Sequence, residues 1–321
     1  MSVRRIHIAL LALLTVTVIW GWTFSWMKSA IEAGAAQLGE AMPLIVGLFM
    51  TVRFGLAALL MPILIPASRR GVGGAGVVRD GGLIAAVLYL GFLLQMFGLE
   101  GVDPAVSAFL TSLYVGFVAL FSSLLDRRPL GWVAATGVLL VTIGAGFISG
   151  PPRLSFGLPE WLTVLCAVLF ASHIVATDRI TRSQPPLAVA WLSFCWVGLG
   201  SAVLLAYGMA RRPDVSIEQV LTLLMTHEFL QPALLAGLLG TLVALSLLTN
   251  YQKALSPVRA AILYSLEPVW AALIALGLGQ VGLSGWLVFG GGMLLAGNLW
   301  MEIWPRVRPS PRGVDEQEGP A

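Results

Sequence analysis

The chain has 321 residues, of which 58% are hydrophobic and 11% charged, and its mean hydropathy is +0.88. A soluble domain carries about 25% charged residues because its surface must face water. The composition therefore excludes a soluble globular protein and indicates an integral membrane protein whose surroundings are the lipid bilayer. The formal net charge of +3 does not indicate a nucleic-acid partner, because the basic residues lie in short tethers between apolar runs.

The first apolar run, from Ile6 to Met27, follows a basic start that is typical of signal peptides. It is longer than the apolar core of a signal peptide, about 7–15 residues, and is therefore predicted to remain as a transmembrane helix. Since a bilayer core of about 30 Å needs roughly 20 apolar residues in a helix, the sequence predicts an all-α protein with ten spans. They are 6–27, 43–66, 81–99, 104–125, 131–149, 159–178, 187–209, 229–250, 256–279 and 283–304.

Positive charge predicts the orientation, because Lys and Arg gather on the cytoplasmic side of a membrane. With the N-terminus in the cytoplasm, fourteen basic residues fall inside and four fall outside (Lys28, Arg153, Arg211 and Arg212), while Arg53 lies within a span. The outer loops instead carry acids such as Glu100 and Glu160. The sequence therefore predicts a multi-pass protein of the cell (plasma or inner) membrane with both termini in the cytoplasm.

An internal repeat divides the chain. A shift of 153 residues without gaps aligns Pro104 with Pro257, Ser112 with Ser265, Gly137 with Gly290 and Gly144 with Gly297. The predicted organisation is a first five-helix repeat (1–149), a linker (150–158), a second repeat (159–304) and a disordered cytoplasmic tail (305–321). Because five is odd, the second repeat crosses the membrane in the opposite sense, as in secondary transporters whose binding site lies between the halves.

Several segments resemble one known family. "VIWGWTFSWMKSAIE" (18–32) looks like the opening helix of EamA-type members of the drug/metabolite transporter superfamily, and "TVRFGLAALLMP" (51–62) is similar to their second helix. The segment 250–280 resembles their ninth span, and "GWLVFGGGMLLAGNLW" (285–300) their closing helix. The resemblance implies a ten-helix carrier that moves small organic solutes, often outward, by alternating access. One departure is Gly279-Gln280, where family members commonly carry "GE".

Glu267 is the first candidate for a functional residue, because it falls in the middle of the ninth predicted span with Pro268 directly behind it. An ionised carboxylate at the centre of a membrane helix costs at least ~2.5 kcal/mol, so it must be paired, protonated or in contact with a watery cavity. Two roles are open: a protonation or substrate-amine site, and a structural acid that is paired with Arg53 or hydrogen-bonded to a neighbouring helix.

Arg53 is the second candidate. A guanidinium stays charged and offers five donors, so Arg53 is suited either to a substrate carboxylate or to tying helices together, with Glu267 as one possible partner. His173 can titrate near neutral pH or can simply hydrogen-bond a neighbouring helix.

Further polar and aromatic side chains are candidates because the resemblance places their spans around the central cavity. They are Gln95, Ser112, Asn250, Tyr264 and Ser265, together with Tyr114, which the repeat pairs with Glu267. Their alternative role is to join helices, at about 0.6 kcal/mol each. Aromatic walls for the cavity can come from Trp20, Trp22, Trp26 and Trp270. The alternative for the first three is the aromatic belt at the membrane surface.

The sequence offers little for catalysis or cofactors. "GVGGAG" (71–76) matches a dinucleotide fingerprint, but it lies in a tether between membrane helices rather than after a strand. Three scattered histidines and two cysteines within apolar runs build no predicted metal site. We therefore expect no cofactor and no enzyme, but a secondary transporter of a small organic metabolite, such as an amino acid, working as an exporter. A channel or a non-transporting scaffold is the alternative, and a homodimer is possible.

Overall fold

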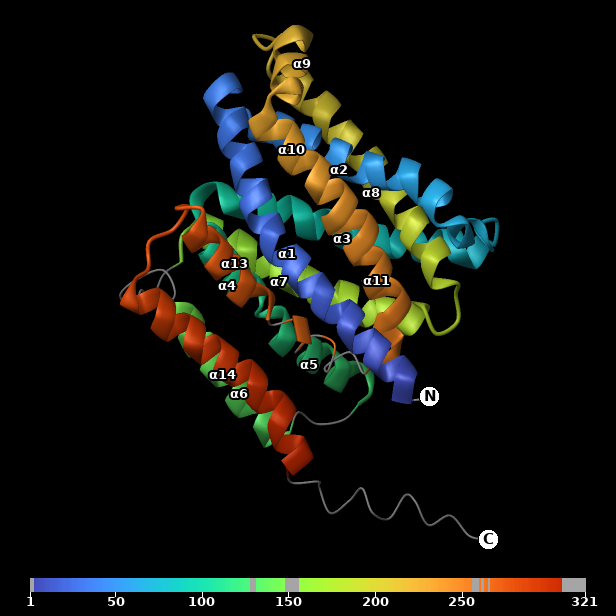
Figure 1. The fold of residues 1–321 in the computed structure, drawn as a ribbon, viewed down its shortest axis with the longest axis vertical. Helices are drawn as coiled ribbons and strands as arrows, with labels where there is room; N and C mark the ends of the chain where they lie inside the picture. Colours follow the sequence, from blue (N-terminus) through green and yellow to red (C-terminus); the bar gives the residue numbers. More distant parts are fainter. Residues whose placement is uncertain are drawn as a thin grey trace.

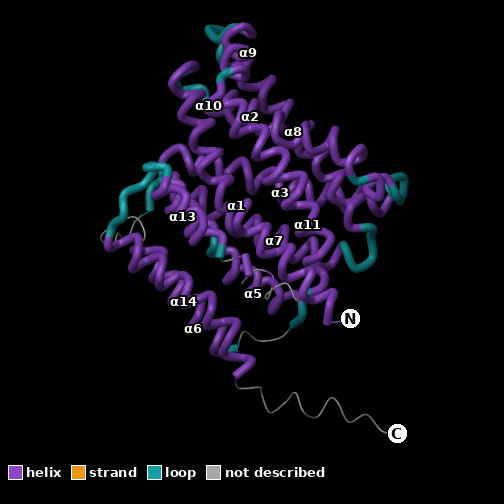
Figure 2. The backbone as a smooth tube through the Cα atoms, in the orientation of Figure 1, coloured by secondary structure: helices purple, strands orange, loops and turns teal. Residues whose placement is uncertain are grey.

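The computed structural model describes residues 3–127, 131–147, 156–255, 260, 263–264 and 266–307. Within these ranges every regular element is a helix (Figures 1 and 2). Up to residue 147 they are α1 (Val3–Leu38), α2 (Met42–Leu64), η1 (Pro66–Arg69), α3 (Ala75–Gly101), α4 (Pro104–Thr111), α5 (Tyr114–Leu125) and α6 (Trp132–Phe147). From residue 158 they are α7 (Leu158–Ile180), α8 (Pro186–Arg211), α9 (Ile217–Met225), α10 (His227–Leu235), η2 (Ala236–Val243), α11 (Ala244–Tyr251), η3 (Gln252–Ala254), α13 (Glu267–Gly277) and α14 (Gly285–Val307).

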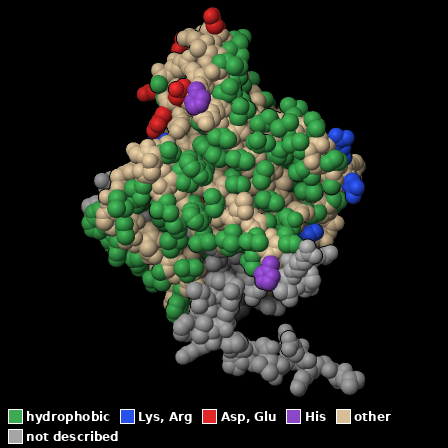
Figure 3. Space-filling model, viewed as in Figure 1, with side chains coloured by type: hydrophobic (Ala, Val, Ile, Leu, Met, Phe, Trp, Pro, Cys, Tyr) green, Lys and Arg blue, Asp and Glu red, His purple; other side chains and the backbone are tan. Residues whose placement is uncertain are grey.

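The helices confirm a multi-pass, all-helical membrane protein. Among the described residues, seven helices or continuous helix runs are long and apolar enough to cross a bilayer. They are His7–Leu38, Met42–Leu64, Ala75–Gly101, Pro104–Leu125, Leu158–Ile180, Pro186–Arg211 and His227–Ala254. Hydrophobic side chains cover much of the flank seen in Figure 3, as expected of a surface that faces lipid. The finer prediction, that ten spans form two inverted repeats, stays a prediction.

Two predicted spans contain a local irregularity. The span 104–125 divides into α4 and α5 at Ser112, whose hydroxyl donates to the Phe109 carbonyl at 2.7 Å. Such back-bonding by serine competes with the helical ladder and bends helices. The span 229–250 contains the π-helix η2, in which the Thr241 hydroxyl donates to the carbonyl of Ala236, five residues earlier (3.1 Å). Single π-turns of this kind are often found at functional sites.

Close backbone contacts hold the helices together. α2 packs on α8 through glycines: a Cβ on Gly47 would lie 2.5 Å from the Leu205 nitrogen, and one on Gly208 would lie 2.6 Å from the Leu44 Cα. α6 and α14 run side by side at the edge of the bundle (Figure 1). Small residues permit this approach, and van der Waals contact then drives helix association in lipid.

The predicted ends differ in detail. The first helix continues to Leu38, beyond the predicted end at Met27, and α14 continues to Val307, beyond the predicted start of the tail. Residues 148–149 of the fifth predicted span, 150–155 of the predicted linker and 308–321 of the predicted tail lie outside the described residues.

Candidate functional site

A small cavity of about 40 Å³ lies among helices from both halves of the chain. Its walls come from α1, α3, α4, α5, α7, α11 and α13. The lining side chains are Trp20, Thr23, Leu88, Phe92, Gln95, Thr111, Tyr114, Phe170, His173, Ile174, Leu245 and Glu267. A largely apolar and aromatic lining with a few polar groups is typical of sites for small organic ligands.

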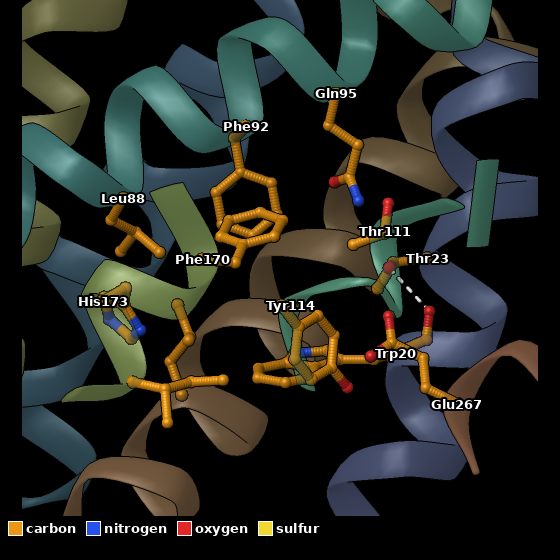
Figure 4. Close-up of a pocket in the computed structure, with 12 residues that line it drawn as sticks. Trp20, Thr23, Leu88, Phe92, Gln95, Thr111, Tyr114, Phe170, His173 and Glu267 are labelled. Carbon is orange, nitrogen blue, oxygen red and sulfur yellow. Dashed lines mark hydrogen bonds between the residues drawn. The ribbon is translucent and has the colours of Figure 1, made fainter. Parts of the chain in front are cut away.

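Aromatic rings make up much of the wall. The rings of Phe92 and Phe170 lie edge to face with their centroids 5.1 Å apart. Figure 4 shows His173 and Leu88 on one side of the cavity and Glu267 on the opposite side, with Tyr114 between them. The cavity thus presents an apolar, aromatic body with polar groups at separate ends, which suits an amphipathic solute.

Glu267 lies at the start of α13 rather than within a continuous helix, because a turn at Leu266 precedes it. Pro268 therefore occupies the first turn, where a missing N–H leaves no hydrogen bond unmade. The predicted span 256–279 therefore contains the start of a helix at Glu267. The carboxylate is 6% exposed, and the N-terminal end of a helix favours negative charge.

Glu267 and Arg53 are not paired. The four ion pairs among the described residues join Arg79 to Asp80, Arg179 to Asp126, Arg182 to Asp178 and Arg212 to Asp214. The hypothesis of a Glu267–Arg53 pair is therefore wrong for this conformation. The reason is placement: Arg53 points toward η2 and the wall residue Phe92, whereas Glu267 faces the cavity from α13.

Arg53 is held by other contacts. Its Nε donates to the Thr241 hydroxyl at 2.8 Å, and its Nη1 lies 3.7 Å from the Met27 sulfur. Its guanidinium carbon stands 4.1 Å from the centroid of the Phe92 ring, within the range of a cation–π interaction. The side chain is 1% exposed. These contacts support the prediction that Arg53 joins helices, and they leave the other predicted role open.

The remaining predicted residues divide into two groups. Gln95, Tyr114 and His173 line the cavity with Glu267. Tyr264 is buried and packs on the Trp20 ring at 5.7 Å, while Ser112 is used by the bend between α4 and α5. Asn250 is half-buried and Trp22 is 38% exposed, and neither is among the lining residues. Ser265 lies outside the described residues.

Trp20, one of the tryptophans predicted as a possible cavity wall, and Thr23, which was not predicted, both line the cavity from α1. The helix continues to Leu38, so Trp20 lies near its middle rather than at the membrane surface. The Trp20 Nε1 donates to the Gly240 carbonyl of η2 at 3.2 Å. Trp20 and Thr23 are close enough in the sequence to lie on one face of a helix. That spacing is the feature from which Thr23 could have been predicted as a lining residue. The wall residues Phe92, Thr111 and Phe170 look like ordinary core residues in the sequence.

Comparison with known proteins identifies the class. Residues 158–302 match the EamA-like transporter family. The chain is 28% identical over 276 residues to an "Uncharacterized transporter" of Archaeoglobus fulgidus, covering 85% of this chain and 79% of that protein. A solved crystal structure, 18% identical, covers 94% of this chain and 99% of its own with a TM-score of 0.63, and shows a shared fold.

These likenesses and the helical bundle define a membrane transporter. The match of residues 158–302 to the EamA-like transporter family agrees with the resemblance seen in the sequence.

We predict that Glu267→Gln folds as well as the wild type. Glu267 forms no hydrogen bond or ion pair with any described side chain, so the change removes a buried charge without orphaning a partner. The midpoint of thermal unfolding in detergent should stay within about 2 °C, which corresponds to less than 1 kcal/mol.

Asp178→Asn is the matched control for that measurement. Asp178 is also buried, but its carboxylate accepts from both Nε and Nη2 of Arg182 at 3.0–3.2 Å. Removing this charge should cost about 1 kcal/mol. A clearly larger loss for Glu267→Gln than for Asp178→Asn would mean that Glu267 has a structural partner.

Proposed function

We propose that the protein is a secondary carrier for a small organic metabolite, such as an amino acid or a similar amphipathic compound. The observation that carries this proposal is the cavity, which is built from helices of both halves and combines aromatic walls with Glu267. The binding sites of secondary transporters lie between structural halves in this way. Outward transport is proposed on the family resemblance alone.

The proposed architecture is two inverted five-helix repeats, 1–149 and 159–304. The contacts of α6 with α14 support it: a Cβ on Gly144 would lie 2.7 Å from the Gly290 oxygen, and one on Gly297 would lie 2.8 Å from the Gly137 oxygen. The shift of 153 residues exchanges these two contacts, since it pairs Gly137 with Gly290 and Gly144 with Gly297. A pseudo-two-fold axis between the halves accounts for that exchange.

Glu267 is the proposed coupling group. A carboxylate in a membrane cavity must exchange between protonated, solute-bound and paired forms as the cavity opens to either side. Its repeat counterpart Tyr114 faces the same cavity. We propose that the two halves rock about this cavity. Glu267 binds a proton and a solute amine alternately during this cycle.

Flux measurements test the carrier function. Purified protein in liposomes is given a mixed panel of metabolites, with and without an imposed pH gradient, and protein-free liposomes serve as the control. Saturable movement of at least one solute supports a carrier. A flux that rises linearly with concentration favours a channel, and the absence of flux for the whole panel favours a scaffold.

We also predict the orientation in the cell membrane. In a chain whose Cys166 and Cys195 are replaced by alanine, Gly73→Cys should react with impermeant reagents only from the cytoplasmic side. Thr222→Cys should react only from the outside. Both positions are exposed and outside the spans: Gly73 lies in the turn before α3, and Thr222 lies on the short helix α9. In Figure 3 acidic side chains gather at the end that carries α9, and basic ones lie along a separate edge. This separation supports the proposed orientation, because Lys and Arg gather on the cytoplasmic side. Reversed labelling of the two sites would contradict the proposal.

A further inference from the structure

A buried cation lies directly behind the cavity wall. Arg53 is 1% exposed and forms no ion pair with any acid in the described part of the chain. An arginine within a membrane span is costly unless an anion, a carbonyl or water compensates its charge. Helix packing alone does not explain why this charge is kept here.

The hydrogen bonds of Arg53 leave one end of the guanidinium unused. Nε is satisfied by the Thr241 hydroxyl at 2.8 Å, and Nη1 has only the weak acceptor Met27 Sδ at 3.7 Å. Nη2 is buried and has no acceptor among the described residues. Since a guanidinium carries five N–H groups, a strong acceptor is missing on the Nη2 side.

This unused end borders the cavity. A Cβ placed on Gly240 would lie 2.7 Å from Thr23 Cγ2 and 3.5 Å from Arg53 Nη2, so Thr23 and Nη2 flank the same small space. Thr23 lines the cavity, as does Phe92, on whose ring the guanidinium stacks at 4.1 Å. Thr23 and Phe92 therefore separate Arg53 from the cavity, and neither is a charged group that would compete for an anion there.

The π-helix η2 builds this arrangement. It supplies the acceptor Thr241 and the side-chain-free Gly240, and its carbonyl at Gly240 is fixed by Trp20 Nε1 at 3.2 Å. A regular helix would rotate these residues relative to one another, because an extra residue per turn changes the face on which each one lies. The irregularity thus holds the guanidinium with its free edge beside the cavity.

We infer that Arg53 is the anion-binding group of this cavity and takes the carboxylate of the transported solute. This inference rests on the proposed carrier function and deepens it. A planar guanidinium matches a carboxylate through two parallel hydrogen bonds, and Nη2 supplies the unmet donor. A rotation of the Phe92 ring away from the guanidinium opens the path from the cavity. The solute class is an amphipathic carboxylate, whose apolar body packs on Phe92 and Phe170.

Binding of matched solutes tests this inference without transport. Purified protein in detergent and chloride-free buffer is titrated with phenylalanine against phenethylamine, and with 3-phenylpropionate against its amide. Thermal stabilisation and the fluorescence of tryptophan, of which Trp20 lines the cavity, report binding. The wild type should bind the carboxylate of each pair about tenfold more tightly or better, the usual size of a hydrogen bond to a charged group.

Variants separate recognition from folding. In Arg53→Gln, the affinity for the carboxylate should be close to the affinity for the other member of each pair, so that their ratio is near one. Arg53→Lys keeps the charge but loses the planar fork, and should reduce the ratio several-fold. Thr241→Val removes the acceptor of Nε and leaves the charge, so it should keep the preference for carboxylates. If Thr241→Val loses the preference as fully as Arg53→Gln, Arg53 acts only through packing and the inference fails.

Each other outcome is also decisive. A wild-type ratio near one overturns the inference even where Arg53→Gln does not fold, and it leaves the carrier proposal intact because solutes still bind. Stabilisation by added chloride that is equal to that by carboxylates overturns it as well, in favour of an inorganic anion. If no member of either pair binds at any concentration, the cavity is not a solute site and the proposed function falls together with the inference.

Discussion

Replacing Gly47 by alanine is expected to lower the midpoint of thermal unfolding by roughly 5 °C or more. The new Cβ would lie 2.5 Å from the Leu205 nitrogen and 2.7 Å from the Leu205 Cα. These are backbone atoms of α8, so no rotamer change relieves the clash and the two helices must move apart. Overpacking of this kind costs about 1–3 kcal/mol, which is about 2–4 °C per kcal/mol in a protein of a few hundred residues.

Gly55→Ala is the matched control for this variant. Gly55 lies on the same helix, but a Cβ there would meet nothing within 4 Å. Alanine is favoured over glycine inside a helix by about 0.5–1 kcal/mol, so Gly55→Ala should be neutral or slightly stabilising. Equal effects of the two substitutions would show that α2 and α8 do not pack at the distance seen here. Size-exclusion chromatography in detergent and thermal unfolding give the comparison.

The composition predicts the class of fold because lipid imposes a strong constraint. Helices are required wherever unpaired backbone groups would face hydrocarbon, so long apolar runs such as Pro186–Arg211 can be located from hydropathy alone. The bend at Ser112 and the π-helix at 236–243 leave hydropathy unchanged. They depend on which hydroxyl hydrogen-bonds which carbonyl, and that choice is made by tertiary packing.

The sequence predicts those parts of the candidate site that carry charged side chains. Glu267 stands out because an acid in an apolar run is costly, and the repeat then indicates Tyr114. The aromatic wall of Phe92 and Phe170 gives no such signal, because phenylalanine is common in any apolar core. The predicted Glu267–Arg53 pair is wrong for a related reason. Opposite charges in a sequence do not show where each group lies, and here Arg53 is behind the cavity wall whereas Glu267 lines the cavity.

Glu267→Gln is expected to abolish gradient-driven accumulation of the transported solute while leaving the protein folded. The amide has nearly the same shape as the acid, but it neither binds a proton at neutral pH nor carries a charge for a solute amine. If Glu267 is the coupling group, accumulation of the solute against its gradient should fall to the level of protein-free liposomes. Exchange of the solute across the liposome membrane at equal concentrations is the companion measurement.

The two measurements separate coupling from binding. A coupling role predicts that Glu267→Gln loses its response to the pH gradient but still exchanges solute, because the cavity walls are unchanged. A substrate-amine role predicts that both are lost for amine-bearing solutes and kept for solutes without an amine. His173→Gln provides a second titratable position on the opposite side of the same cavity. Full gradient dependence in Glu267→Gln and its loss in His173→Gln would move the coupling role to the histidine. Full dependence in both variants would place proton coupling outside these two groups.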